Sequence, residues 1–281
     1  MPKSDPKPAI SVITVTRQRL DILKRKLETL KAQSLPPEQF ELVLCVNGDP
    51  DTLRVVKDWQ TPFALELLSF EKNMGSAKAR NVCVARARAP LLYLSDDDAL
   101  LNPDTLQKHL EFHQNNETCV VVGGVDWEYE GELEPMRPQR VNYWNLHAVN
   151  TSLPKEVFTA AGGFPEWLTT YGFEDILLGY ALAKRGVPLV ALPEVAVRHL
   201  GANPMRGLQP DKAHSAGQNA VRIVQKYPEL AFRLGVHPFL LLLKRIALRS
   251  PLSVIWKSLN EGSFRYERAY LEGALEEKRH V

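Results

Sequence analysis

The chain has 281 residues, of which 44% are hydrophobic, a size that suits one large domain or one domain with an extension. This composition excludes disordered and low-complexity proteins. The 35 basic and 33 acidic residues give a net charge of +2, which lacks the basic excess expected of a general nucleic-acid binder.

The first half of the chain alternates apolar strands with helices. A proline-rich leader over residues 1–8 is expected to be disordered. Apolar, β-branched runs predict strands at Ala9–Val15, Phe40–Val46, Leu65–Ser69 and Leu91–Ser95. Helical patterns lie between them at Leu20–Leu30, Thr52–Trp59 and Gly75–Arg88, with Asn102-Pro103 capping a further helix. Such alternation predicts an α/β, Rossmann-like fold with a mostly parallel central sheet flanked by helices.

The second half is less regular. A strand is expected at Thr118–Gly124, and the long polar and aromatic stretch Val125–Val149 is expected to carry function. The patterns then predict a helix, two short strands and a loop, at Phe173–Lys184, Val187–Leu192, Val195–His199 and Gly201–Gln218. A composition shift near Tyr227 divides the chain into a catalytic domain over residues 9–227 and a helical C-terminal extension over residues 228–281.

The C-terminal extension combines apolar and basic residues. Leu230–Leu259 contains five basic residues and no acidic one, around the apolar run Phe239–Leu243. Such helices either lie on an anionic membrane surface or pack on the protein itself or on a second subunit. Pro238 and Pro251 divide the stretch into short pieces and favour packing. No apolar run approaches the roughly 20 residues of a membrane-spanning helix, so we expect at most peripheral membrane contact or dimerisation.

Three cysteines are widely spaced and form no CxxC pair. This pattern argues against a disulfide framework or a zinc knuckle and favours a reducing, cytoplasmic environment. The first residues also lack the apolar region of a secretory signal. We therefore expect a cytoplasmic protein, which could work at the inner face of the cell membrane.

Three adjacent carboxylates, Asp96-Asp97-Asp98, directly follow the strand at Leu91–Ser95. Ligands of open parallel sheets bind at the carboxyl ends of the strands, so the triplet is aimed at a site. Its mutual repulsion requires compensation, most simply by a divalent cation that itself carries a phosphate. The alternative is a solvated acidic turn.

Further motifs place this triplet in a wider pattern. In order they are Ser11–Ile13 with Thr16, Leu42–Gly48, Asn73–Asn81, the triplet, Gly162–Phe164, Gly172–Asp175 and His199. In this order and spacing, the chain from Ala9 to Gly201 resembles the family 2 glycosyltransferases, nucleotide-sugar enzymes with the GT-A fold. The resemblance implies transfer of a sugar, with inversion, from a nucleotide-diphosphate donor to an acceptor hydroxyl.

The resemblance also implies residues for the nucleotide. Thr16 and Asn47 would hold the base, and Asp96 of the DxD signature would contact the ribose, beside Asp97. Arg80 would neutralise phosphate charge, although a surface arginine is an equal alternative. Because Val46-Asn47 replaces the frequent pair of aspartates, the identity of the donor nucleotide stays open.

The remaining implied roles concern the metal and the reaction. Asp98 and His199 would bind Mn²⁺ or Mg²⁺ at the diphosphate. Asp175 would be the general base, and Glu174 would orient the acceptor. Both acids also suit the first turn of a helix, where the helix dipole is expected to keep Asp175 ionised at neutral pH.

Two other functions remain open. A sugar-phosphate nucleotidyltransferase would carry a glycine-rich loop after the first strand, where this chain has Thr16–Arg19 without glycine. A non-catalytic carbohydrate-binding protein would need neither the triplet nor the acid pair. His109 and His113 have the i, i+4 spacing of a zinc pair but lack the adjacent Glu of the zincin motif, so we interpret them as structural.

Overall fold

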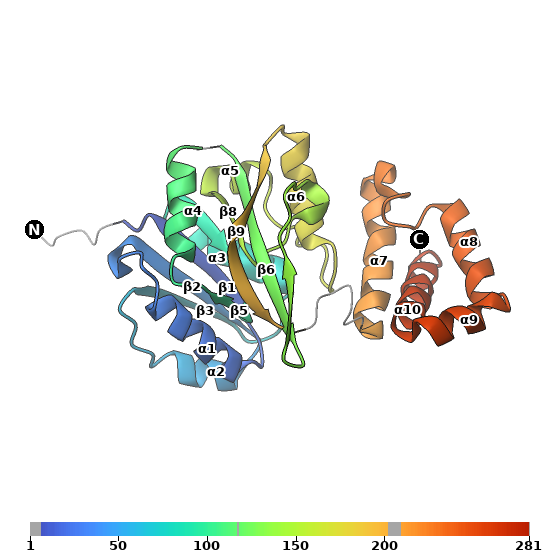
Figure 1. The fold of residues 1–281 in the computed structure, drawn as a ribbon, viewed down its shortest axis with the longest axis horizontal. Coiled ribbons are helices and arrows are strands. Elements are labelled where there is room, and N and C mark those ends of the chain that lie inside the picture. The colour runs from blue at the N-terminus through green and yellow to red at the C-terminus, as the bar shows by residue number, and fades with distance from the viewer. Residues whose placement is uncertain (1–6, 117, 202–208, 281) are drawn as a thin grey trace, which may run out of the picture. The chain divides into compact units, whose positions relative to one another are not determined.

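The computed structural model describes residues 7–116, 118–201 and 209–280, so six residues of the predicted leader lie outside it. The chain divides into two compact units (Figure 1). The first, the catalytic unit, comprises residues up to Thr169 and Glu174–Gly201. The second, the C-terminal unit, combines Thr170–Phe173 with the chain beyond Gly201.

The catalytic unit is built on a nine-stranded sheet. Its strands are β1 (Ile10–Thr16), β2 (Phe40–Asn47), β3 (Ala64–Phe70), β4 (Leu91–Leu94), β5 (Ala99–Leu101), β6 (Val120–Tyr129), β7 (Glu132–Met136), β8 (Thr151–Pro154) and β9 (Leu189–Leu200). Its α-helices are α1 (Leu20–Lys31), α2 (Pro50–Val56), α3 (Ser76–Arg86), α4 (Thr105–Gln114), α5 (Lys155–Ala160) and α6 (Glu174–Lys184), with 3₁₀ turns η1 (Pro37–Gln39) and η2 (Tyr143–Asn145).

The sheet order is β3-β2-β1-β4-β8-β6-β9-β5, with β7 paired to β6. The strands β3, β2, β1 and β4 are all parallel, as is the pair β6–β9, while β8, β7 and β5 pair antiparallel with their neighbours. Successive strand residues face opposite sides: Leu42 and Leu44 pack with α1 and α4, whereas Val43 and Cys45 pack with α3, α5 and α6. The predicted α/β sheet covered by helices is confirmed.

Several predicted boundaries were wrong for long-range reasons. Asn102 caps no helix: its amide donates to the carbonyl of Ala196 on β9 at 3.0 Å, and α4 begins later, at Thr105. The two short strands predicted around residues 187–199 form one strand, β9, with a register shift opposite Gly123 and Gly124. The stretch after Val125 begins as the β6–β7 hairpin.

The C-terminal unit consists of α7 (Pro210–Lys226), η3 (Pro228–Leu230), α8 (Pro238–Arg249), α9 (Leu252–Leu259) and α10 (Glu261–Glu277). Helix α7 was predicted to be a loop at its start and to belong to the catalytic domain. It instead packs on α10 through glycines: a Cβ at Gly217 would lie 2.1 Å from the carbonyl oxygen of Tyr270. The compact units thus separate at Gly201, with Thr170–Phe173 in the second unit, and the domain boundary near Tyr227 stays a prediction.

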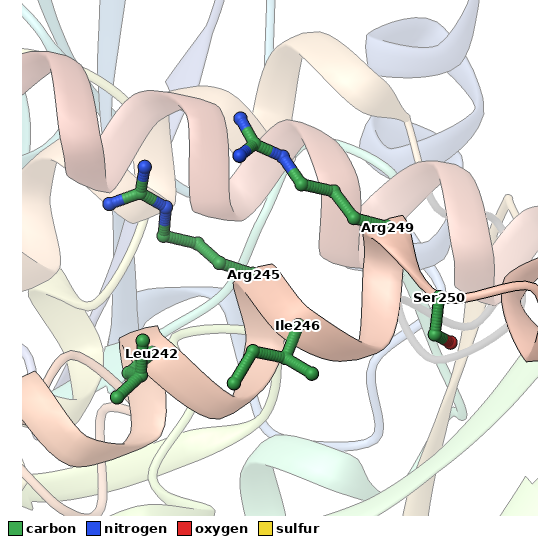
Figure 2. A pocket seen from close by; sticks show the side chains of 5 residues that line it. All are labelled: Leu242, Arg245, Ile246, Arg249 and Ser250. Atoms are coloured by element: carbon green, nitrogen blue, oxygen red, sulfur yellow. The ribbon is translucent and has the colours of Figure 1, made fainter.

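Helices α8 and α9 are less buried than α7 and α10. Leu241 is the buried residue of α8. Figure 2 shows the residues that line a hollow on α8: the guanidinium groups of Arg245 and Arg249 extend to one side, and Leu242 and Ile246 extend to the other. None of the helices in the described part of the chain combines the length and apolarity that a membrane crossing requires.

Candidate active site

The acidic triplet lies where β4 leaves the sheet and turns into β5. The backbone N–H of Ser95 still bonds to β1, at the carbonyl of Ile13 (3.1 Å), before the chain turns away. Strand β5 then pairs antiparallel with β9 and sets Ala99 opposite His199. This pairing brings Asp98 to His199, with Oδ1 and Nε2 2.9 Å apart, although the two residues are a hundred positions apart in the chain.

Asp97 and Asp98 are held by residues from the end of β1 and from β9. The Thr16 hydroxyl donates to Asp97 Oδ2 at 2.7 Å, and Arg19 contacts both carboxylates, at 3.2 Å to Asp97 Oδ1. We call these residues, together with His199, the Arg19 cluster. Burial, with the charge of Asp98, raises the pKa of Asp97 to about 6. Burial alone would raise the pKa of Asp98, but His199 and Arg19 outweigh it and lower that pKa.

Two residues of the Arg19 cluster, together with the adjacent Asp96, offer donors suited to a divalent cation. One ligand atom from each of Asp96, Asp98 and His199 can be chosen so that all lie within 4.8 Å of one another. Nδ1 of His199 is buried and has no hydrogen-bond partner among the described residues. The ring of Trp127 lies against this imidazole, with centroids 4.4 Å apart. Two carboxylates and one imidazole form a donor set that fits Mn²⁺ or Mg²⁺.

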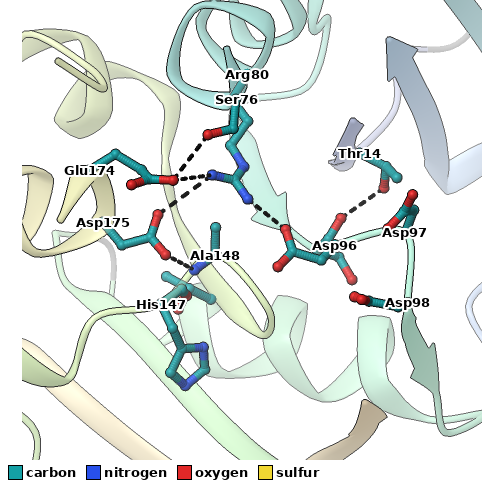
Figure 3. A network of polar contacts seen from close by, with 12 residues as sticks. Thr14, Ser76, Arg80, Asp96, Asp97, Asp98, His147, Ala148, Glu174 and Asp175 are labelled. Atoms are coloured by element: carbon teal, nitrogen blue, oxygen red, sulfur yellow. Dashed lines mark hydrogen bonds and ion pairs between the residues drawn. The ribbon is translucent and has the colours of Figure 1, made fainter. Parts of the chain in front are cut away.

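A second group of acids surrounds Arg80 on α3 (Figure 3). Its guanidinium bonds to Asp96 at 2.6 Å and lies 3.9 Å from Glu174 Oε1 and 3.7 Å from Asp175 Oδ1. The Ser76 hydroxyl donates to Glu174 at 3.0 Å. We call Arg80 and these three carboxylates the Arg80 cluster. One buried guanidinium lies within 4 Å of three carboxylates that come from two distant parts of the chain. Arg80 is therefore not the surface arginine of the alternative interpretation, since only 11% of its side chain is exposed.

Asp175 differs from the prediction in its protonation. Its Oδ1 is buried without a hydrogen bond in the described structure, and its Oδ2 accepts from the backbone N–H of Ala148 at 3.0 Å. Burial raises the pKa of Asp175 to about 7; Arg80 opposes this effect, and the charges of Glu174 and Asp96 add to it. The expected ionisation of this carboxyl at neutral pH is thus opposed by desolvation and by the charges of Glu174 and Asp96.

The two residues assigned to the nucleoside base lie at adjacent strand ends. Thr16 ends β1 and Asn47 ends β2, next to each other in the parallel register. The Asn47 amide accepts from the Met74 N–H at 2.9 Å and donates to Asn73 Oδ1 at 2.9 Å. It therefore organises the turn that precedes α3. Contact with a base stays a prediction for both residues.

Sequence reasoning missed two buried basic side chains near the triplet. Lys26 of α1 is fully buried and donates to Ser95 Oγ at 2.6 Å and to the Ala99 carbonyl at 3.0 Å, so it holds both ends of the triplet turn. Burial lowers its pKa to about 8. Its position on the apolar face of α1, three residues after Leu23 and four before Leu30, was an available signal.

The second missed residue is His147, which precedes the Ala148 amide that binds Asp175. Both ring nitrogens of His147 are buried without hydrogen-bond partners among the described residues. Burial lowers its pKa to about 4, so the ring is neutral at physiological pH. It lies in the polar stretch predicted to carry function.

The histidine pair at His109 and His113 has a structural role. His109 is fully buried, with Nδ1 2.7 Å from Ser152 Oγ and Nε2 2.9 Å from Asn150 Oδ1. His113 Nε2 lies 2.9 Å from the same serine hydroxyl. These contacts link α4 to β8 and agree with the structural interpretation.

Comparisons with known proteins connect this geometry to a family. The chain is 29% identical over 269 residues to validoxylamine A glucosyltransferase of Streptomyces hygroscopicus subsp. limoneus, covering 79% of this chain and 58% of that protein. It is 25% identical over 180 residues to glucosyl-dolichyl phosphate glucuronosyltransferase of Haloferax volcanii, covering 56% of each. The chain thus spans about 60% of the length of the first curated relatives that it matches.

Solved structures share the fold. S. aureus TarS 1–349 in complex with UDP-GlcNAc has a TM-score of 0.65 at 18% identity, with 97% of this chain and 92% of that chain covered. The mannosyltransferase PcManGT from Pyrobaculum calidifontis, in complex with GDP-Man and Mn²⁺, has a TM-score of 0.63 at 20% identity, with 98% and 88% covered. At these identities the likeness establishes the GT-A fold alone.

The family assignment rests on a direct sequence match. The model of glycosyl transferase family 2 matches residues 11–169, more than half of the chain. The matched range contains all but the first residue of β1, the strands β2 and β4 and the acidic triplet, and it ends shortly before the acid pair. This match favours the transferase over the nucleotidyltransferase alternative. The chain belongs to glycosyl transferase family 2.

Proposed function

We propose that this protein transfers a hexose, with inversion, from a nucleoside diphosphate sugar to an acceptor hydroxyl. The observation that carries the proposal is the pairing of two carboxylate groups at one sheet edge: the Arg19 cluster with its cation-binding donors, and the Arg80 cluster with its general-base candidate. Relatives named as glucosyl- and glucuronosyltransferases and neighbours bound to UDP-GlcNAc or GDP-Man support a nucleotide-hexose donor.

In the proposed reaction, the acceptor oxygen attacks the anomeric carbon while the bond from that carbon to the diphosphate oxygen breaks. The acceptor proton passes to Asp175. Glu174, held by Ser76, orients the acceptor, and Arg80 keeps both acids in place. A carboxyl with a pKa of about 7 is well matched to this task, since it is half ionised near neutral pH and still basic.

The leaving diphosphate requires positive charge. Asp98 and His199 would hold Mn²⁺ or Mg²⁺, with Asp96 near the ribose, and the bound ion would offset the charge on the departing diphosphate. The guanidinium of Arg19 contacts Asp98 and the adjacent Asp97. Thr16 and Asn47 would contact the base.

We also propose that the enzyme works in the cytoplasm. Cys45, Cys83 and Cys119 are all free thiols buried in the catalytic unit. Unpaired, buried thiols suit a reducing compartment.

The test is release of nucleoside diphosphate from a panel of UDP- and GDP-hexoses, with Mn²⁺, Mg²⁺ or EDTA and a panel of hydroxyl acceptors. We expect metal-dependent release that falls about 10²- to 10⁴-fold in Asp175→Asn. Glu111→Gln is the matched control, because Glu111 is an exposed acid on α4, and its activity should equal wild type. Release that is unchanged in Asp175→Asn would contradict the proposed base, and release in EDTA would contradict the metal requirement.

A further inference from the structure

Helix α8 presents an apolar stripe to the outside. Phe239, Leu242, Leu243 and Ile246 have the i, i+3, i+4, i+7 spacing of a single helix face. Between 46% and 58% of each of these residues is exposed. An apolar stripe of this kind normally faces a core, and here the core-facing residue of the helix is Leu241. The amphipathic face of α8 is thus uncovered within the described part of the chain.

Exposed apolar residues also lie on α9. Val254, Ile255 and Leu259 are 71%, 56% and 82% exposed, respectively. Single exposed apolar residues are ordinary, but a cluster of seven on two consecutive helices indicates a surface that contacts something else. We call the exposed apolar residues of α8 and α9 the α8–α9 face.

The charged residues of α8 and α9 are all positive, and of these Lys244 is paired, with Glu267 of α10. Arg245, Arg249 and Lys257 are exposed, and they have no ion-pair partner among the described residues. Residues 231–260 contain no Asp or Glu. Helix α10 of the same unit is different, since its Arg265 and Arg268 form i, i+4 pairs with glutamates.

These charges decide between the occupants of the face. A second copy docked by two-fold symmetry would set two faces of positive charge against each other, which costs free energy. An anionic lipid surface offers phosphates for the cations and a hydrocarbon boundary for the leucines and isoleucines. Figure 2 shows both kinds of side chain on α8: two guanidinium groups extend to one side, and Leu242 and Ile246 extend to the other.

We propose that the α8–α9 face binds the surface of a membrane rich in anionic lipids. Its apolar side chains enter the headgroup boundary, and Arg245, Arg249 and Lys257 contact lipid phosphates. This binding needs no sugar donor, so it stands apart from the proposed transferase activity.

The test is flotation of the full chain with vesicles of phosphatidylcholine alone or with 30% phosphatidylglycerol (about a third anionic lipid, enough to engage basic residues). We expect binding to the anionic vesicles that weakens as salt is raised. Arg245→Gln with Arg249→Gln should weaken partition by about 30-fold, at about 1 kcal/mol for each basic residue. Leu242→Ser with Ile246→Ser should weaken it by about tenfold or more.

The matched control is Arg265→Gln with Arg268→Gln, which removes the same charge from α10 and should leave partition unchanged. Circular dichroism melts establish that each variant is folded. Equal binding to neutral and anionic vesicles, no binding at all, or equal losses in the control pair would overturn the proposal. So would a dimer in sedimentation that Leu242→Ser dissociates, since the face would then be covered by a second copy.

Discussion

The two carboxylate clusters of the site are built from the same side-chain types in different ratios. In the Arg19 cluster, Asp97 and Asp98 share a guanidinium, an imidazole and the Thr16 hydroxyl. In the Arg80 cluster, three carboxylates share one guanidinium. In the Arg19 cluster the pKa of Asp98 lies below its usual value, although burial raises that of Asp97 to about 6; in the Arg80 cluster burial raises that of Asp175 to about 7. The opposite charges beside Asp98 and the burial of Asp175 thus distinguish the proposed cation ligand from the proposed base.

The largest expected effect is on metal affinity, which substitutions in the Arg19 cluster should weaken and substitutions in the Arg80 cluster should not. Asp98→Asn with His199→Gln should weaken Mn²⁺ binding by about 100-fold or more, because an imidazole and a charged oxygen ligand are lost. Electron paramagnetic resonance of free Mn²⁺, with a nucleoside diphosphate present, measures this affinity. Glu174→Gln with Asp175→Asn should leave the affinity within a few-fold of wild type. An equal loss of Mn²⁺ affinity in the two double variants would contradict the assignment of metal binding to Asp98 and His199.

The pH dependence of activity should follow the Arg80 cluster. Because the raised pKa of Asp175 leaves it protonated below about 7, kcat/KM should fall about tenfold per pH unit below that value and level off above it. Rates at saturating metal between pH 5.5 and 8.5 measure this limb. A rate that is flat down to pH 5.5 would show that Asp175 is not the titrating base.

Replacing Arg80, the positive charge shared by the three carboxylates, should shift the pH dependence of kcat/KM. Arg80→Met should raise the pKa of Asp175 further, since an opposite charge nearby lowers a carboxyl pKa by about 1 to 3 units. The rising limb of kcat/KM should shift to higher pH by a similar amount. Arg80→Lys, which keeps the charge, should shift it less. The same pH profile in wild type and Arg80→Met would contradict the assigned electrostatics.

The stability of the acid pair should depend on pH in the opposite sense to a salt bridge. The folded pKa of Asp175 lies above the unfolded value, so this carboxyl contributes stability at low pH that is lost as pH rises through about 7. Asp175→Asn should therefore have a higher Tm than wild type at pH 8, with the gap narrowing as pH falls and closing below the ordinary carboxyl pKa of 3.8. A lower Tm at pH 8 would indicate a net favourable ion pair with Arg80 instead.

The smallest expected effect concerns Arg19, whose side chain is 45% exposed. Arg19→Gln should lower the Tm by a few degrees, for a loss of about 1 kcal/mol. Added Mn²⁺ should raise the Tm of Arg19→Gln more than that of wild type, because the ion takes over the missing positive charge. The pH dependence of kcat/KM should be the same in Arg19→Gln as in wild type.

Local patterns predicted most of the elements and placed the functional acids at strand or helix ends. The apolar runs located β1 to β4 within a residue or two, and helical spacing located α1 and α3. The errors came from pairings that no local pattern encodes. Strand β5 has three residues and exists because it pairs with β9, nearly a hundred positions later. The α7 helix lay in a segment whose glycines suggested a loop, yet Gly217 permits close packing on α10.

The sequence by itself determined the α/β sheet and the position of the triplet, because apolar periodicity and strand ends are local properties. Only the tertiary structure decided how many positively charged side chains contact each carboxylate and how deeply that carboxylate is buried. Arg80, Asp96 and Asp175 meet from three separate segments. Desolvation and Coulomb energies depend on distance in space, so the protonation of Asp175 was not encoded in its neighbours along the chain.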